Sequence, residues 1–268
     1  MPRPNEDTTM RVPPERFPPG FRRPTFAALA LLAGLATAGD DPATPAGAGM
    51  QEAATPPATR ASTPATIGDG AARDALRAAI GRALSAPAPD TAPADPRLAF
   101  RRDPEISREV QRRMLEAGAR TPGTRRGMEG LFASGALLRE YDALLSRFGY
   151  SPQNLADVIA AYLVVSWEIV NERDSNDEPA GQRAVRAQLV APLAADPAIL
   201  AMSDAEKQAY AEQLAYMTMI LGAGYQDVRR RGQRRQLADM QTAVRGNVLA
   251  TGVDLERMAL TPQGLLPR

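Results

Sequence analysis

Carboxylates are the side chains with which this sequence could perform acid–base chemistry. Cysteine and histidine are absent from the 268 residues, which excludes thiolate nucleophiles, zinc–thiolate sites and serine–histidine triads. Lysine occurs only at Lys207, so Schiff-base chemistry would require this one residue. Three possibilities remain: catalysis by Asp and Glu side chains, binding of a hard cation by oxygen atoms, or no catalysis.

Glu168 is the candidate general acid, because it follows Trp167 in the most apolar segment of the chain. A carboxyl group among apolar side chains has a raised pKa, as in enzymes that cleave glycosidic bonds. However, Asp157, Glu168 and Glu172 recur at helical spacing on one stripe, which favours a solvated helix face, and Trp167 then belongs to the core. A carboxylate-dependent hydrolase acting on envelope glycans is therefore retained as an alternative function.

The loop "NERDSNDEP", residues 171–179, concentrates oxygen ligands that could hold calcium, including Asp174 and Asp177. The EF-hand pattern does not fit this loop. With Asp174 in the first position, Pro179 stands where glycine is required and Val185 stands where a bidentate glutamate is required. We expect a solvent-exposed connection between two helices, with no metal and no other cofactor.

The densest positive charge lies in "RRRGQRR", Arg229–Arg235. Such a cluster could contact the phosphates of nucleic acid or of anionic lipid, which makes a nucleic-acid or anionic-surface binder a second alternative. No aromatic residue interrupts the cluster, and the net charge of the whole chain is only +1. A solvated helix end is favoured, because arginines suit the negative pole of a helix. The candidate residues are Arg229, Arg230, Arg231, Arg234 and Arg235.

The segment "RRPTFAALALLAGLATAGDD", Arg22–Asp41, has the pattern of a secretory signal peptide. Its apolar run, Phe26–Ala38, is shorter than the about 20 residues that span a bilayer, and it ends in the small-residue pattern Ala-Thr-Ala. We predict a signal peptide over residues 1–38, cleavage after Ala38, and a periplasmic or secreted protein without a transmembrane anchor. Whether translation begins at Met1 or Met10, and whether export follows the general or the twin-arginine route, stays open.

Residues 39–95 are rich in Ala, Pro, Thr and Gly and lack apolar periodicity, so we expect a disordered linker. Within this linker, residues 73–84 place Leu76, Ile80 and Leu84 at helical spacing, which allows one short helix.

Residues 96–268 are predicted to form one all-α domain, a single helical bundle of about five to six helices. Aromatic residues make up only 5% of the chain, so the core must consist of Ala, Leu, Val, Ile and Met, which favours helices over strands. Asp103-Pro104 is typical of a helix start, and Ser203 with Glu206 forms a capping box. No strand with period-two alternation is found. The expected helices cover about residues 104–117, 128–148, 151–171 (apolar nearly all round and therefore central), 182–193, a long stretch after Ser203, and 233–250.

Three stretches, "SPQNLADVIAAYLVVSWEIVN", "MSDAEKQAYAEQLAY" and "LTPQGL", are similar to sequences of a family of exported bacterial helical proteins that is known only as a domain of unknown function. The resemblance covers about Leu98 to Leu265. It implies a helical fold and export, and it offers no catalytic residues to carry over. Together with the residues above, it favours an exported helical binding or structural module of the bacterial cell envelope, without evident catalytic activity. Its partner would be an envelope protein or a small ligand rather than nucleic acid.

Overall fold

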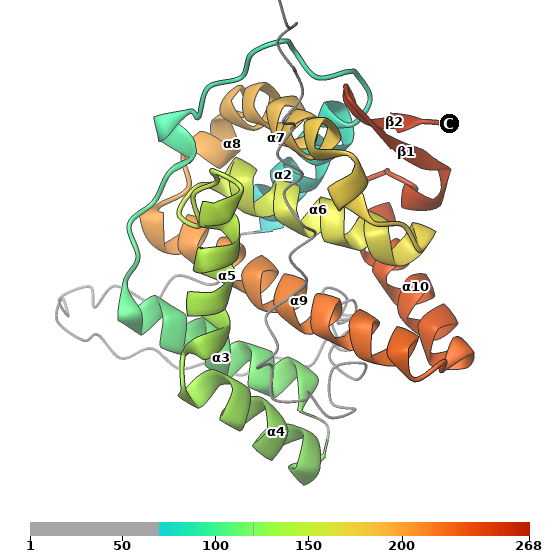
Figure 1. Cartoon of the computed structure of the whole chain (residues 1–268). Helices are drawn as coiled ribbons and strands as arrows, with labels where there is room; N and C mark the ends of the chain where they lie inside the picture. The colour runs from blue at the N-terminus through green and yellow to red at the C-terminus, as the bar shows by residue number, and fades with distance from the viewer. Residues whose placement is uncertain (1–69, 120) are drawn as a thin grey trace, which may run out of the picture.

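The fold is all-α, as predicted. The computed structural model describes residues 70–119 and 121–268, so the predicted signal peptide and residues 39–69 of the predicted linker lie outside the described residues. The described part contains nine α-helices and one β-hairpin (Figure 1). The helices are α2 (Gly70–Ala83), α3 (Pro104–Gly118), α4 (Pro122–Ala133), α5 (Ala136–Arg147), α6 (Leu155–Asn171), α7 (Pro179–Ala194), α8 (Pro197–Leu200), α9 (Asp204–Arg230) and α10 (Arg234–Leu249).

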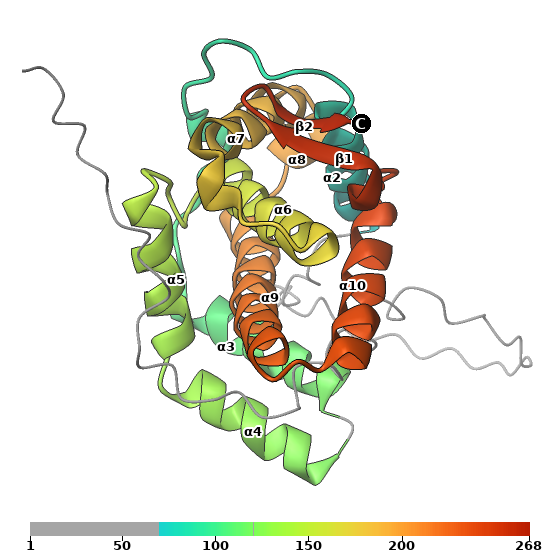
Figure 2. The same cartoon turned by 45° about the vertical axis from the view of Figure 1, so that its right-hand side comes forward.

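The centre of the bundle is α6, the helix that is apolar on nearly all sides. It packs against α7, α9 and α10, and Figures 1 and 2 show it between the α7 layer and the long helix α9. Leu155, Val158, Ile159 and Ile169 are fully buried in this position. A helix that presents apolar side chains in every direction is stable in water only when other elements cover all of its faces.

Two helix boundaries differ from those expected. The helix expected over residues 128–148 is two helices, α4 and α5, because Gly135 turns the chain with a left-handed φ of 62° that glycine adopts without strain. The helix expected from residue 151 begins at Leu155, because the side chain of Asn154 accepts a hydrogen bond from the backbone N–H of Ala156 and caps it there. The break at Gly135, with α2 and the short α8, accounts for a larger number of helices than the five or six expected.

Helix α2 belongs to the domain core and packs against α7 and α8. Leu76 and Ala79 are fully buried, and Ile80 is 4% exposed. After α2, the chain crosses the surface with specific contacts, such as the hydrogen bond from the N–H of Ala88 to the carbonyl of Gln263 (2.8 Å). Helix α2 thus covers most of residues 73–84, where the sequence allowed one short helix, and its apolar stripe completes part of the core.

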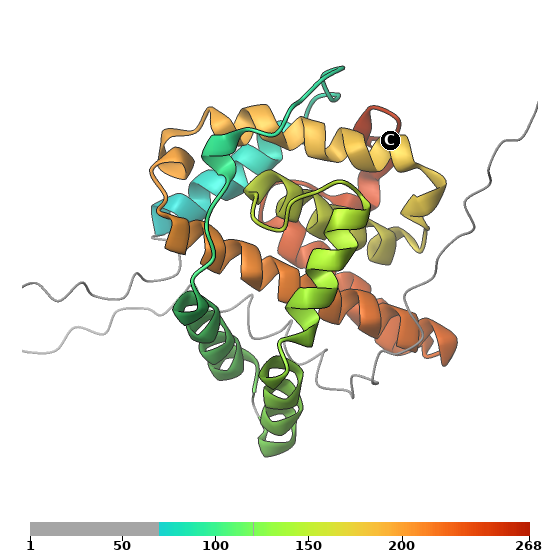
Figure 3. The same cartoon turned by 60° about the vertical axis from the view of Figure 1, so that its left-hand side comes forward.

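Helices α3, α4 and α5 form an arm, residues 104–147, that extends from one side of the molecule (Figure 3). The two chain segments that join this arm to the rest lie antiparallel to each other. Ala99 and Asn154 form an isolated β-bridge, and the N–H of Phe100 donates to the carbonyl of Gln153 (3.1 Å). The arm thus leaves and re-enters the domain at one place, and α3 and α5 pack on α9.

The C-terminal residues form a β-hairpin, although the sequence showed no strand pattern. Strand β1 (Met258–Thr261) pairs antiparallel with β2 (Gly264–Pro267), with Leu260 opposite Leu265. The hairpin packs on α7, where the buried side chain of Gln188 donates to the carbonyl of Leu265 (3.1 Å) and accepts from its N–H (3.0 Å). A helix side chain thus supplies hydrogen bonds that a third strand would otherwise provide.

Candidate functional site

Glu168 is enclosed by the connection between α6 and α7 rather than exposed on a solvated face. Its Oε1 accepts hydrogen bonds from the backbone N–H of Ser175 (2.9 Å) and from the Ser175 hydroxyl (2.5 Å). The Ser175 hydroxyl in turn accepts from Nε2 of Gln182 on α7 (2.7 Å). Burial raises the pKa of Glu168, and the hydrogen bonds from Ser175 oppose this rise. The expectation of a solvated stripe is therefore wrong for this residue.

Asp157, on the same stripe, is also buried, with 3% of its surface exposed. Its carboxylate accepts from the backbone N–H of Ser151 (2.8 Å) and pairs with Nε of Arg186 on α7 (2.6 Å). Periodicity located these acids on one side of α6 correctly. It did not reveal that the α6–α7 connection and α7 itself cover that side, because the spacing of residues within one helix carries no information about its neighbours.

Trp167 lies in the core, as its place on the helix suggested, and is 4% exposed. Its indole N–H donates to the carbonyl of Met258 in β1 (3.0 Å). Although Trp167 and Glu168 are adjacent in sequence, one holds the C-terminal hairpin and the other holds the α6–α7 connection. They do not form a joint site.

The acidic loop makes local turn contacts. Asp174 caps the short 3-10 helix Ser175–Asp177 by accepting from the backbone N–H of Asn176 (2.9 Å) and from its side chain (2.7 Å). Asp177 is exposed. No group of three or more acidic, histidine or cysteine side chains suited to a metal ion occurs among the residues that the structure describes.

Lys207, the sole lysine, is buried in the first turns of α9. Its ammonium group donates to the backbone carbonyl of Arg97 (2.7 Å), and the residue is 7% exposed. A Schiff base at Lys207 would require a carbonyl substrate to reach this buried nitrogen and replace a structural hydrogen bond.

The five candidate arginines form one exposed surface at the turn between α9 and α10, hereafter the arginine surface. Arg229 and Arg230 end α9, and Arg231 is its C-cap. Gly232 turns the chain with a φ of 66°, and Arg234 and Arg235 begin α10. All five are exposed. The guanidinium of Arg229 lies 5.3 Å from the ring centroid of Tyr225, a cation–π arrangement that directs it along α9.

Two acids contact the arginine surface in the described part of the chain. Asp227 pairs with Arg230 (3.3 Å) and with Arg231 (2.9 Å), and Glu172 is 3.9 Å from Arg234. Helix α10 has no acidic residue in its first turn and no side-chain cap, so two arginines stand at the positive pole of this helix, where the dipole disfavours them. The surface therefore retains an excess of positive charge.

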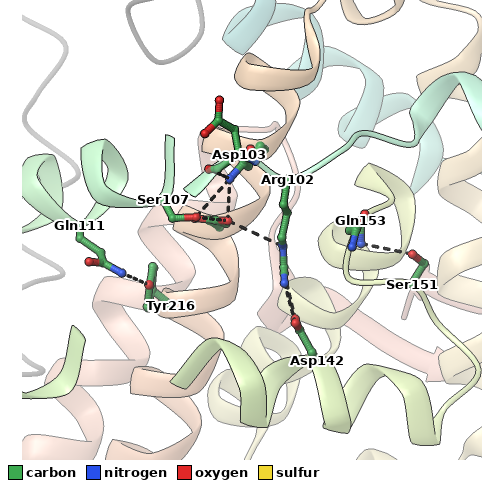
Figure 4. Close-up of polar contacts among 10 residues, drawn as sticks. Arg102, Asp103, Ser107, Gln111, Asp142, Ser151, Gln153 and Tyr216 are labelled. Atoms are coloured by element: carbon green, nitrogen blue, oxygen red, sulfur yellow. Dashed lines mark hydrogen bonds and ion pairs between the residues drawn. The ribbon is translucent and has the colours of Figure 1, made fainter. Parts of the chain in front are cut away.

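A second polar cluster, which sequence reasoning missed, joins the arm to α9 (Figure 4). It is a ladder of three rungs, each linking a residue to the one 105 positions later. The backbone N–H of Asp103 donates to Oε1 of Gln208 (2.7 Å), the Ser107 hydroxyl donates to Oε1 of Glu212 (2.9 Å), and Nε2 of Gln111 donates to the hydroxyl of Tyr216 (2.7 Å). The equal separation means that α3 and α9 run in the same direction, in register.

Charge in the polar ladder is unbalanced. The guanidinium of Arg102 makes a bidentate pair with Asp142 of α5 (2.5 and 2.8 Å), and its Nε is 3.7 Å from Oε1 of Glu212. One cation thus serves two carboxylates. Oε2 of Glu212 is buried without a hydrogen-bond partner among the described residues, and burial raises the pKa of this carboxyl group while Gln208, Ser107 and Arg102 lower it.

The sequence did contain a signal for this ladder. Polar residues recur every fourth position on both helices, as Asp103, Ser107 and Gln111 on one and as Gln208, Glu212 and Tyr216 on the other. Each set forms one stripe on its helix. The stripes are matched only when the two helices are parallel, which requires a tertiary arrangement that the spacing does not contain.

Comparison with known proteins places the chain in a family. Residues 23–268 match a family of unknown function, DUF6683. The chain belongs to this family. No curated protein and no solved structure matches the chain.

Membership in DUF6683 covers more of the chain than the resemblance at Leu98–Leu265 suggested. The match includes α2 and every other described element, in agreement with the packing of α2 into the core. No described helix has the length and apolar character to cross a membrane. The family has no established activity, so a functional assignment depends on the surfaces of this chain.

Proposed function

We propose that this DUF6683 protein is an exported, non-catalytic binding module of the bacterial cell envelope that uses the arginine surface to bind a negatively charged partner. The observation that carries this proposal is the set of five exposed arginines at one helix–helix turn, contacted by only two acids among the described residues. Guanidinium groups bind carboxylates and phosphates with two parallel hydrogen bonds. An excess of them on one surface favours an anionic partner.

A glycan hydrolase with Glu168 as its acid is less well supported. Such enzymes need two carboxyl groups about 5–10 Å apart on either side of a substrate, with the acid free to donate its proton. Oε1 of Glu168 instead receives two hydrogen bonds from Ser175, which is itself held by Gln182. These contacts give Glu168 a defined role in closing the α6–α7 connection.

Binding through the arginine surface is tested with immobilised heparin as a polyanionic probe. The double variant Arg234→Gln/Arg235→Gln should elute at a lower salt concentration than the unaltered protein, because fewer counterions are released on binding. The matched control is Arg125→Gln/Arg126→Gln, which removes the same charge from two exposed arginines of α4. Equal elution of the two double variants would contradict a binding role for the arginine surface.

Export is tested by the intact mass of the protein recovered from separated periplasmic and cytoplasmic fractions. We expect a periplasmic species that begins at Gly39, because cleavage is predicted after Ala38. A full-length cytoplasmic species would contradict export. In that case the heparin experiment would still report on the arginine surface, so the two parts of the proposal can fail separately.

A further inference from the structure

The arm is joined to the rest of the domain through a narrow base and a partly polar interface. Its two connecting segments are bridged at Ala99 and Asn154, and the substantial packing of α3 and α5 outside the arm is on α9. Three hydrogen-bonded rungs cross this interface, and the middle rung contains Glu212, whose side chain is only 1% exposed. An ionisable group is thus buried between two parts of the molecule that are connected at one place.

Neighbouring charges do not neutralise Glu212 fully. Arg102 faces it from the segment before α3, but the two terminal nitrogens of that guanidinium bind Asp142 of α5. When Glu212 and Asp142 are both ionised, this group of three carries a net charge of −1. Tyr216 of α9 is the remaining titratable neighbour, and burial raises its pKa to about 12, so it stays neutral and adds no further negative charge.

We propose that the arm is a hinged unit whose attachment to α9 is controlled by the ionisation of Glu212. The protonated acid fits the interface, since it buries no charge and still accepts the hydrogen bond from Ser107. Oε2 has no hydrogen-bond partner in either form, but an incompletely paired buried charge costs more than an unpaired neutral hydroxyl group. If the arm turned away from α9 about its bridged base, water would reach the carboxylate of Glu212.

The direction of the effect follows from the raised pKa of Glu212 in the attached state. A group that holds its proton more tightly in the attached state favours attachment at low pH. The contribution of Glu212 to attachment is complete below the pKa of the solvated group. It is lost as the pH rises through the pKa of the attached state. Apolar side chains of the arm, including Val110 and Phe132, also pack inward, so ionisation shifts the equilibrium between attached and detached arm and does not abolish attachment.

The test is hydrogen–deuterium exchange of the unaltered protein between about pH 4 and about pH 8. The exchange of α3–α5 amides is divided by that of α6 amides to remove the intrinsic dependence of exchange on pH. We expect this ratio to rise with pH, by about tenfold for each unit by which the pKa of Glu212 in the attached arm exceeds that of the solvated group. A ratio that stays constant over this range would overturn the proposal, and this measurement requires no variant to fold.

Two variants assign the effect to Glu212. Glu212→Gln copies the shape of the protonated acid and should hold the ratio at its low-pH value throughout. Glu129→Gln removes an exposed carboxylate from α4 of the same arm and should retain the dependence of the unaltered protein. If Glu212→Gln keeps the full pH dependence, another group controls the arm and the proposal is wrong.

Discussion

The side chain of Gln188 fills the space that a Cβ atom at Gly264 would need. A Cβ built there lies 2.1 Å from Oε1 of Gln188, and Gly264 has a φ of 108°. From this position, the side chain of Gln188 donates hydrogen bonds to the carbonyls of Ala86 (2.6 Å) and Leu265 (3.1 Å). It also accepts one from the N–H of Leu265. One buried amide thus joins α7, the segment after α2 and the hairpin.

Gln188→Ala should lower the free energy of unfolding by about 3 kcal/mol, because the buried N–H and carbonyl of Leu265 and the carbonyl of Ala86 lose their partner. Gly264→Ala should cost at least about 2 kcal/mol, because it combines a disfavoured φ with a steric clash. Urea denaturation measures both changes. Gln153→Ala, at an exposed position, is the control and should change the stability by less than about 0.5 kcal/mol. A similarly small effect of Gln188→Ala would contradict the central role of this amide.

The buried carboxyl group of Glu168 should make stability depend on pH. Its pKa is raised by burial in the folded protein, so the folded state binds a proton more readily than the unfolded state. Its contribution to stability is therefore complete below the unfolded pKa and is lost as the pH rises through the folded pKa. Glu168→Gln should weaken this loss, which thermal melts across the pH range measure.

Asp177→Asn is the control for Glu168→Gln, because it removes a carboxylate from the same connection at an exposed position. Its melting temperature should follow the pH in the same way as that of the unaltered protein. If Asp177→Asn and Glu168→Gln behave alike, the dependence arises from the general charge of the loop and not from the burial of Glu168.

Trp167, the one tryptophan, reports on the hairpin. Its burial predicts a blue-shifted fluorescence maximum that moves to longer wavelength when the hairpin detaches. Trp167→Phe should lower the free energy of unfolding by about 1–3 kcal/mol, because it removes the hydrogen bond to Met258 and leaves unfilled volume. Leu249→Ala, at an exposed position, is the comparison for loss of an apolar side chain without burial. An equal cost for both variants would contradict a structural role for the indole.

The capping box at the start of α9 should stabilise the longest helix. The Ser203 hydroxyl accepts from the backbone N–H of Glu206 (3.3 Å), and Oε2 of Glu206 accepts from the backbone N–H of Ser203 (2.7 Å). Ser203→Ala should cost about 1 kcal/mol. Ser146→Ala, near the end of α5, removes an exposed hydroxyl that bonds within its own helix and should have a smaller effect. Chemical denaturation followed by circular dichroism distinguishes the two.

Local signals predicted the elements more accurately than their arrangement. Asp103-Pro104 and Ser203 with Glu206 mark the starts of α3 and α9 where the structure has them, because a cap involves residues a few positions apart. The hairpin was missed because Gln188, far away in sequence, supplies part of its hydrogen bonding. Glu168 was assigned to a solvated face because the residues that cover it belong to the next segment of the chain.

The sequence by itself determined the all-α class, the apolar central helix and the absence of thiol and imidazole chemistry, since these depend on composition and on spacing within single helices. The sequence also identified the exposed arginine cluster Arg229–Arg235, because a dense run of charged side chains favours solvent. Only the tertiary structure decided that α2 completes the core, that Asp157 is buried and Glu168 is held by Ser175, and that Ser107 meets Glu212. The physical reason is that burial and hydrogen-bond partners depend on which helices become neighbours, and helical periodicity defines a face without defining what packs against it.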